Sequence, residues 1–241
     1  AARDVFHRLN YELSQSKTTV SSTTATSITG EAGETRLRSS LKYVLSKDTR
    51  DSRFDPTVGY FLEMDETLAG FGGDVNFLRT KLSAAYYKPL LFESVILGVT
   101  GKLGYVTGLG DKVTQSQRFN LGGRNIRGFG SGGIGPRDTG SSDAVGGNKM
   151  YAGSFEVVSH LGLDKNTGVR WTVFTDFGSL WGTDYPSGVT KPNAAQMRVS
   201  AGVGVFWSTA IGPLSFSWAK PLSKMAHDTP KTFQFNIGAR L

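Results

Sequence analysis

Residues 198–208 read R-V-S-A-G-V-G-V-F-W-S, in which apolar side chains alternate with small or polar ones. Successive side chains of a β-strand point to opposite faces, so this period of two predicts a strand with one apolar and one polar face. The end of the chain, at residues 232–241, reads T-F-Q-F-N-I-G-A-R-L and alternates in the same way. There the apolar face carries Phe233, Phe235 and Ile237, and the polar face carries Gln234, Asn236 and Gly238.

The same alternation recurs in about ten segments along the chain. Many of them are roughly 10–13 residues long, whereas a soluble strand usually has about 5–6 and a tilted strand that crosses a bilayer needs about 9–11. Tyrosine and tryptophan close several apolar faces, as in the aromatic girdle where lipid meets water. We therefore predict an all-β protein, an antiparallel transmembrane β-barrel, with strands near residues 4–15, 35–47, 57–67, 74–88, 93–107, 148–161, 168–180, 196–208, 212–221 and 231–241.

The composition excludes several other classes of protein. Of 241 residues, 31 are glycine and none is cysteine, so the chain is neither a disulfide scaffold nor a cysteine-ligated zinc protein. Its 15 Phe, 8 Tyr and 4 Trp are too many for a disordered chain. No apolar run approaches the roughly 18 residues of a membrane-spanning helix. The net charge of +7 comes from scattered basic residues, so we expect no nucleic-acid partner.

The connections between these segments differ in length. Short ones are expected at residues 88–92, 164–168 and 210–212, and long ones at 16–34, 108–147 and 182–195. Short turns on one side and long loops on the other are typical of an outer-membrane barrel. A soluble β-sandwich would also alternate, but its strands would be shorter and its polar face richer in Lys, Glu and Thr.

The long connection at residues 108–147 is the least ordinary part of the chain, because loops of this length are usually functional or disordered. Apolar residues such as Ile126 and Phe129 predict that it folds inward and packs in the lumen. Arg127 would then need an acidic partner, and the polar faces of the next two strands offer Glu156 and Asp176. The alternative is a mobile loop whose arginine faces solvent.

Several motifs then show a resemblance to a known family. The segment N-I-R-G-F at residues 125–129 resembles the V/I-R-G-F/Y loop motif of the BamA family of outer-membrane β-barrel assembly insertases. The segments D-T-R-D at 48–51 and D-P-T-V-G at 55–59 resemble a strand end of that family, and A-G-F-G-G-D at 69–74 resembles one of its turns. The segments A-V-G-G-N at 144–148, I-G-P-L at 211–214 and F-Q-F-N-I-G at 233–238 follow in the family's order.

The resemblance implies a domain organisation. Residues 1–241 would be an N-terminally truncated outer-membrane barrel domain, with about ten C-terminal strands of a barrel of about sixteen. The POTRA domains and the first strands would precede it. The loop motif would consist of Ile126, Arg127, Gly128 and Phe129, held in the lumen by Glu156 and Asp176. The seam of the barrel would lie at the terminal strand, at Phe233, Gln234, Phe235, Asn236, Ile237 and Gly238.

The resemblance also implies a function, which is the insertion of β-barrel proteins into the bacterial outer membrane with the terminal strand and seam as template. The partners would be unfolded outer-membrane protein clients, the accessory lipoproteins of the assembly machine and membrane lipid. The alternative is a transport pore, either of the two-partner secretion type or a diffusion porin, because the Arg-Gly-Phe motif alone is shared with secretion transporters.

The sequence carries no recognisable catalytic or metal motif. It has no Gly-x-Ser-x-Gly elbow and no His-Glu-x-x-His, and its glycine-rich loop lacks the Gly-Lys-Ser/Thr that holds a nucleotide phosphate. Asp48, Asp51 and Asp55 lack the spacing of a calcium loop. We therefore expect no enzyme activity, no cofactor and no metal.

Overall fold

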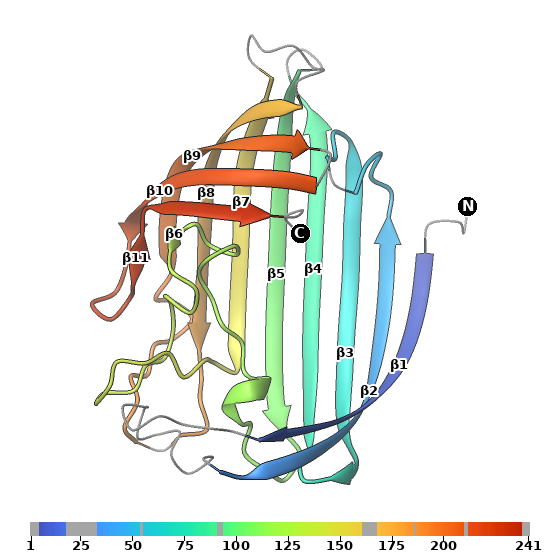
Figure 1. Ribbon diagram of the computed structural model, residues 1–241, viewed down its shortest axis with the longest axis vertical. Helices are drawn as coiled ribbons and strands as arrows, with labels where there is room; N and C mark the ends of the chain where they lie inside the picture. The colour runs from blue at the N-terminus through green and yellow to red at the C-terminus, as the bar shows by residue number, and fades with distance from the viewer. Residues whose placement is uncertain are drawn as a thin grey trace.

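Ten strands form one antiparallel sheet in chain order in the computed structural model, which describes residues 5–17, 33–53, 55–90, 94–160, 168–185, 187–209 and 212–237 (Figure 1). Within these ranges no helix is long and apolar enough to cross a membrane. The strands of this sheet are β1 Val5–Lys17, β2 Thr35–Asp48, β3 Gly59–Gly73, β4 Phe77–Pro89, β5 Val95–Gly108, β7 Lys149–Ser159, β8 Val169–Trp181, β9 Arg198–Thr209, β10 Gly212–Ser223 and β12 Phe233–Ile237.

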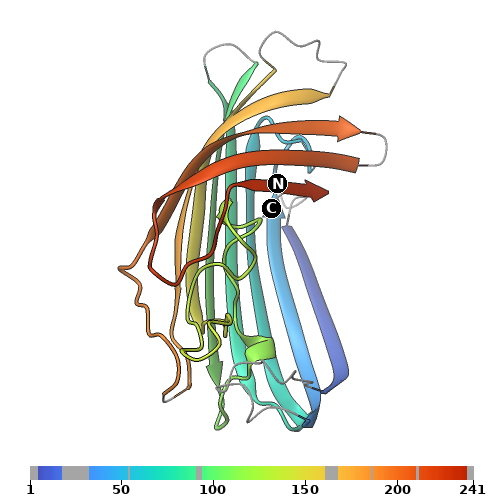
Figure 2. The same cartoon turned by 60° about the vertical axis from the view of Figure 1, so that its left-hand side comes forward.

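The sheet bends strongly, so that it surrounds a hollow on one side (Figure 2). Within the described residues, the two edge strands β1 and β12 are not paired with each other, so the described sheet is open. The long connection between β5 and β7 lies in the hollow, where it contains a short 3₁₀ helix, Gln115–Gln117, and the two-residue strand β6, Gly128–Phe129 (Figure 2). Strand β6 pairs with β11, Pro230–Lys231, which lies just before the terminal strand.

The two faces of the sheet have opposite character. On β9, Val203 and Trp207 point outward and are 50% and 45% exposed. Arg198 and Ser200 point into the hollow and are buried. Because an outer face made of apolar side chains is unfavourable in water, this pattern fits a wall whose outer face meets lipid. The inner face is lined by hydrogen-bonding groups, as a polar lumen requires.

One strand is longer than predicted. The sequence pattern ends the third strand at residue 67 and the family resemblance makes 69–74 a turn, whereas β3 continues to Gly73. The register between β2 and β3 shifts between Arg38 and Ser40, which is a β-bulge. Gly73 has φ +102°, and a Cβ atom there would lie 2.5 Å from the Leu37 carbonyl oxygen. Glycine therefore allows β3 to stay in close backbone contact with β2, so the strand continues where a turn was expected.

The terminal strand begins two residues later than predicted. The expected strand runs over residues 231–241, whereas β12 begins at Phe233 and is described as far as Ile237; residues 238–241, Gly238 among them, lie outside the described residues. Within the described residues, the ladder between β10 and β12 has five residue pairs. Two aromatic pairs support it, with ring centroids 5.0 Å apart for Phe216 and Phe235 and 5.1 Å apart for Trp218 and Phe233.

The connections do not divide simply into short and long. Residues 74–76, between β3 and β4, form a tight turn at the same end of the sheet as the long loop (Figure 1). Residues 49–58, between β2 and β3, form a longer connection at the opposite end. The carboxylates there already have partners: Asp48 pairs with Arg50, Asp51 binds Thr57, and Asp55 pairs with Arg170 of β8. These contacts hold the connection in place.

Candidate functional site

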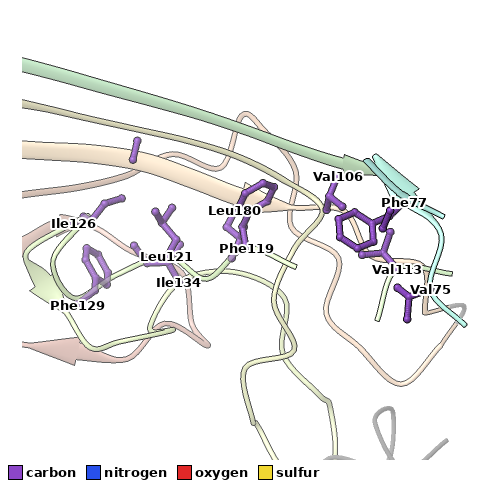
Figure 3. Packing of buried hydrophobic residues seen from close by; sticks show 12 residues of the cluster. Val75, Phe77, Val106, Val113, Phe119, Leu121, Ile126, Phe129, Ile134 and Leu180 are labelled. Atoms are coloured by element: carbon purple, nitrogen blue, oxygen red, sulfur yellow. The ribbon is translucent and has the colours of Figure 1, made fainter. Parts of the chain in front are cut away.

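The inward loop is held by its own apolar core. The side chains of Leu121, Ile126, Phe129 and Ile134 have at most 1% of their surface exposed. Figure 3 shows them clustered on one side of the loop, near Leu180 of the β8 wall. Burying an aliphatic or aromatic side chain of this size contributes about 1.5–3 kcal/mol. A loop with four such anchors has a defined place in the hollow.

Arg127 of the motif reaches the wall through a carboxylate of β8. Its Nε and Nη2 atoms donate hydrogen bonds of 2.8 Å each to the two carboxylate oxygens of Asp176. Its backbone N–H donates a third bond of 2.9 Å to the same carboxylate. Asp176 is fully buried, and Ser154 donates a further bond of 2.6 Å to it. This bidentate geometry is the strong form of an arginine–carboxylate pair.

A second carboxylate and an aromatic ring complete the surroundings of Arg127. Its Nη1 atom donates a bond of 3.0 Å to Glu156 of β7, and its guanidinium carbon lies 3.1 Å from the centroid of the Phe174 ring. Burial by itself lowers the pKa of Arg127, but the hydrogen bonds to Asp176 and the charge of Glu156 more than offset this and raise that pKa above its ordinary value. The guanidinium is therefore charged, and two carboxylates face it.

Gly128 allows the motif to approach the wall. It has φ +89°, and a Cβ atom there would lie 3.2 Å from the Cβ of Ser200 and 3.3 Å from the Cβ of Ala219. The backbone at Gly128 therefore packs directly against small residues of β9 and β10, and a larger residue in place of Gly128 would hold the loop away from this wall. The next residue, Phe129, is fully buried. The four motif residues Ile126–Phe129 therefore form a continuous contact with the inner face.

The residues predicted for the seam divide between the two faces of β12. Phe233, Phe235 and Ile237 point outward with exposures of 45%, 47% and 60%. Gln234 points inward, is buried, and donates a hydrogen bond of 2.6 Å to the carbonyl oxygen of Phe129. Asn236 is half-buried and lines a small cavity of about 120 Å³ together with Arg127. The structure thus brings the terminal strand and the loop motif together, a link that the sequence does not indicate.

Other lumenal contacts are also absent from the sequence prediction. Arg198 of β9 binds Asp228, with bonds of 2.9 and 3.0 Å between buried groups. Arg137 donates 2.9 Å and 3.0 Å bonds to the carbonyls of Ser142 and Gly132 and so closes the loop on itself. The inward position of Arg198 follows from the alternation of β9. Its partner lies on a separate connection, and no local pattern identifies it.

The fold and the site together define a class of protein. They show a bent antiparallel sheet with an apolar outer face and a loop whose arginine is fixed in the lumen, and this is the architecture of a β-barrel wall in an outer membrane. The chain belongs to the Omp85 superfamily, whose domain matches residues 6–241.

Relatives extend this assignment. The chain is 33% identical over 212 residues to the outer membrane protein assembly factor BamA of Neorickettsia risticii, with 88% of this chain and 28% of that protein covered. It is 30% identical over 234 residues to the sorting and assembly machinery component 50 homolog of Homo sapiens, with 92% and 49% covered. The crystal structure of BamA from Haemophilus ducreyi lacking POTRA domains 1-3 is similar, with a TM-score of 0.77, 29% identity, and 87% of this chain and 43% of that chain covered.

The chain therefore spans about half or less of the length of the relatives it matches. The names of these relatives describe assembly factors and machinery components.

Proposed function

We propose that the protein containing this chain inserts and folds other β-barrel proteins in the bacterial outer membrane. The observation that carries the proposal is the terminal strand β12, which has an apolar outer face and, among the described residues, one edge without a partner in the sheet. An exposed strand edge can pair with an incoming strand by β-augmentation. The names of the bacterial relatives, which are outer membrane protein assembly factors, support the proposal.

The proposed mechanism is physical rather than chemical. An incoming client strand gains hydrogen bonds from the edge of β12, and its own apolar face enters lipid beside Phe233, Phe235 and Ile237. In lipid an unpaired backbone group costs several kcal/mol, so pairing is strongly favoured there. The gain comes from closing strand edges, and no nucleotide or covalent step is required.

The proposal includes the rest of the barrel and its partners. In the full-length protein we expect a barrel of about sixteen strands, preceded by POTRA domains, with its seam next to β12. The partners are unfolded outer-membrane protein clients, the accessory lipoproteins of the assembly machine and membrane lipid. The location in a bacterial outer membrane is also proposed. The similarity alone does not decide it, because the relative from Homo sapiens matches a similar share of the chain as the bacterial relative does.

Site-specific photo-crosslinking in the full-length protein tests the template role. A photoreactive amino acid at Phe235, which is 47% exposed, should crosslink to an unfolded outer-membrane protein during its assembly in proteoliposomes. The matched control is Val203, which is 50% exposed on the outer face of β9, two strands away from β12. Equal client crosslinking from both positions, or none from Phe235 while the client folds, would contradict the template role.

The alternative function is a transport pore. Planar-bilayer recordings of the full-length protein distinguish the two functions, because a pore should give large, steady currents for which the inward loop is dispensable. The packed core of the loop in the hollow favours the assembly function, since such a loop obstructs a wide channel.

A further inference from the structure

The last connection of the sheet is joined to the motif loop along its backbone. The Gly130 N–H donates a bond of 2.9 Å to the Thr229 carbonyl, and the Thr229 N–H donates a bond of 2.9 Å to the Gly133 carbonyl. Directly after these, Pro230 and Lys231 of β11 pair with Phe129 and Gly128 of β6. The segment that leads into the terminal strand is thus a partner of the loop.

Side chains reinforce this junction from two directions. Arg137 of the loop donates a bond of 3.0 Å to the Thr229 hydroxyl. On the other side, Asp228 is fixed by the buried Arg198 of β9 and also accepts a bond of 2.6 Å from the Met225 N–H. A buried and fully hydrogen-bonded ion pair holds one arrangement, because breaking it leaves an uncompensated charge. The connection is therefore fixed to the wall as well as to the loop.

The terminal strand itself makes two contacts with the loop. Gln234 Nε2 donates to the Phe129 carbonyl, which lies within the motif. Arg124, just before the motif, donates a bond of 2.9 Å from Nη2 to the Ile237 carbonyl at the other end of β12. The loop thus holds this strand near both ends. These contacts add to the five ladder pairs with β10 that the described part of β12 makes.

We propose that the motif loop is a latch for the terminal strand, with Gln234 as its main positioning residue. While Arg127 is seated on Asp176, the carbonyl of Phe129 is presented to Gln234 and the edge of β12 is fixed. When the loop leaves its seat, β12 loses its contacts with the loop and can separate from the wall. The latch gives the loop control of the templating edge of β12. Its effect on clients rests on the proposed function.

Hydrogen–deuterium exchange of the full-length protein in nanodiscs, without client, measures the latch directly. Gln234→Met has nearly the same shape and removes the donor, so the amides of residues 233–237 should exchange about tenfold faster, as expected for the loss of one buried hydrogen bond. The matched control is Gln115→Met, because Gln115 donates a similar bond, of 3.2 Å, to the Ala144 carbonyl in the same loop. Unchanged exchange in Gln234→Met, or an equal increase in both variants, would overturn the latch.

A disulfide provides the complementary measurement. A Cβ atom at Gly130 would lie 3.9 Å from the Thr229 side chain, so the double variant Gly130→Cys, Thr229→Cys places two thiols next to each other. The chain has no cysteine of its own to compete. When oxidised, this bond should restore slow exchange of residues 233–237 in the Gln234→Met background, and reduction should reverse the effect. Fast exchange in the oxidised form would count against the latch.

The two proposals can fail separately. The exchange measurements contain no client, so they test the latch whatever the protein assembles. If the latch is present but oxidation of the disulfide leaves client folding unchanged, the templating role of β12 is wrong and the latch stands. If exchange is insensitive to Gln234→Met while β12 still crosslinks to clients, the latch is wrong and the proposed function stands.

Discussion

Arg127 and Asp176 are joined by three hydrogen bonds, two from the guanidinium and one from the backbone N–H, although they lie 49 residues apart. The carboxylate is fully buried, and the arginine is 6% exposed. Because the backbone takes part, the pair fixes the path of the loop as well as the position of the side chain.

Replacing Arg127 with alanine should release the loop. The change leaves Asp176 buried without its counter-charge, which costs about 3–5 kcal/mol. In the full-length protein we expect protease cleavage within residues 119–147, where the folded protein resists it, and slower client assembly. Ser131→Ala, at an exposed position of the same loop, is the control. Unchanged protection of the loop in Arg127→Ala would show that the apolar anchors alone hold it.

The two carboxylates should contribute unequally. Asp176→Asn should lower the free energy of unfolding by about 3–5 kcal/mol, because its carboxylate is fully buried and receives four bonds. Glu156→Gln should cost less, about 1.5–3 kcal/mol, since the side chain of Glu156 is 24% exposed. Urea unfolding in detergent micelles measures both variants. Equal losses, or a larger loss for Glu156→Gln, would mean that burial does not decide which carboxylate contributes more to stability.

Gly122 should tolerate no side chain. It has φ +112°, and a Cβ atom there would lie 2.1 Å from the Gly130 carbonyl oxygen. Gly188 is the matched control, because it also has a positive φ, +74°, but no atom lies within 4 Å of the position of its Cβ. Gly188→Ala should lower the free energy of unfolding only by the cost of a left-handed backbone conformation, about 1–2 kcal/mol. Gly122→Ala should lower the melting temperature further, and equal shifts would exclude the predicted clash.

The connection at residues 49–58 should weaken in acid. Burial raises the pKa of Asp51, but hydrogen bonds from Thr57 and Val58 outweigh it and lower that pKa below its ordinary value. A lowered folded pKa gives stability that is present above the unfolded pKa of about 3.9 and is lost as the pH falls through the folded pKa. Amide exchange at Thr57, corrected for intrinsic rates, should therefore lose protection as the pH falls below about 4.

Asp51→Asn is the comparison for that measurement. It should start with lower protection at neutral pH and show little further loss in acid, because no carboxylate is left to titrate there. Equal acid sensitivity in the original protein and in Asp51→Asn would place the titrating group elsewhere in the connection.

The sequence by itself determined the wall. Alternation along segments such as residues 198–208 assigns each side chain to the outer or inner face, because the period of a strand is two and lipid accepts only apolar groups. It also limited the partners of Arg127 to inward carboxylates of the next strands. It could not place the end of β3, because the glycines at 70, 72 and 73 suit a turn and a bulged strand equally well.

Only the tertiary structure decided what the loop touches. Gln234 and Phe129 lie 105 residues apart, and Arg198 and Asp228 lie on separate elements, so no local pattern relates them. These contacts exist because the bent sheet brings β12 over the loop, and because a hydrogen bond stabilises a polar group that is buried inside the hollow. Periodicity fixes the direction of a side chain, whereas its partner depends on how the whole sheet curves.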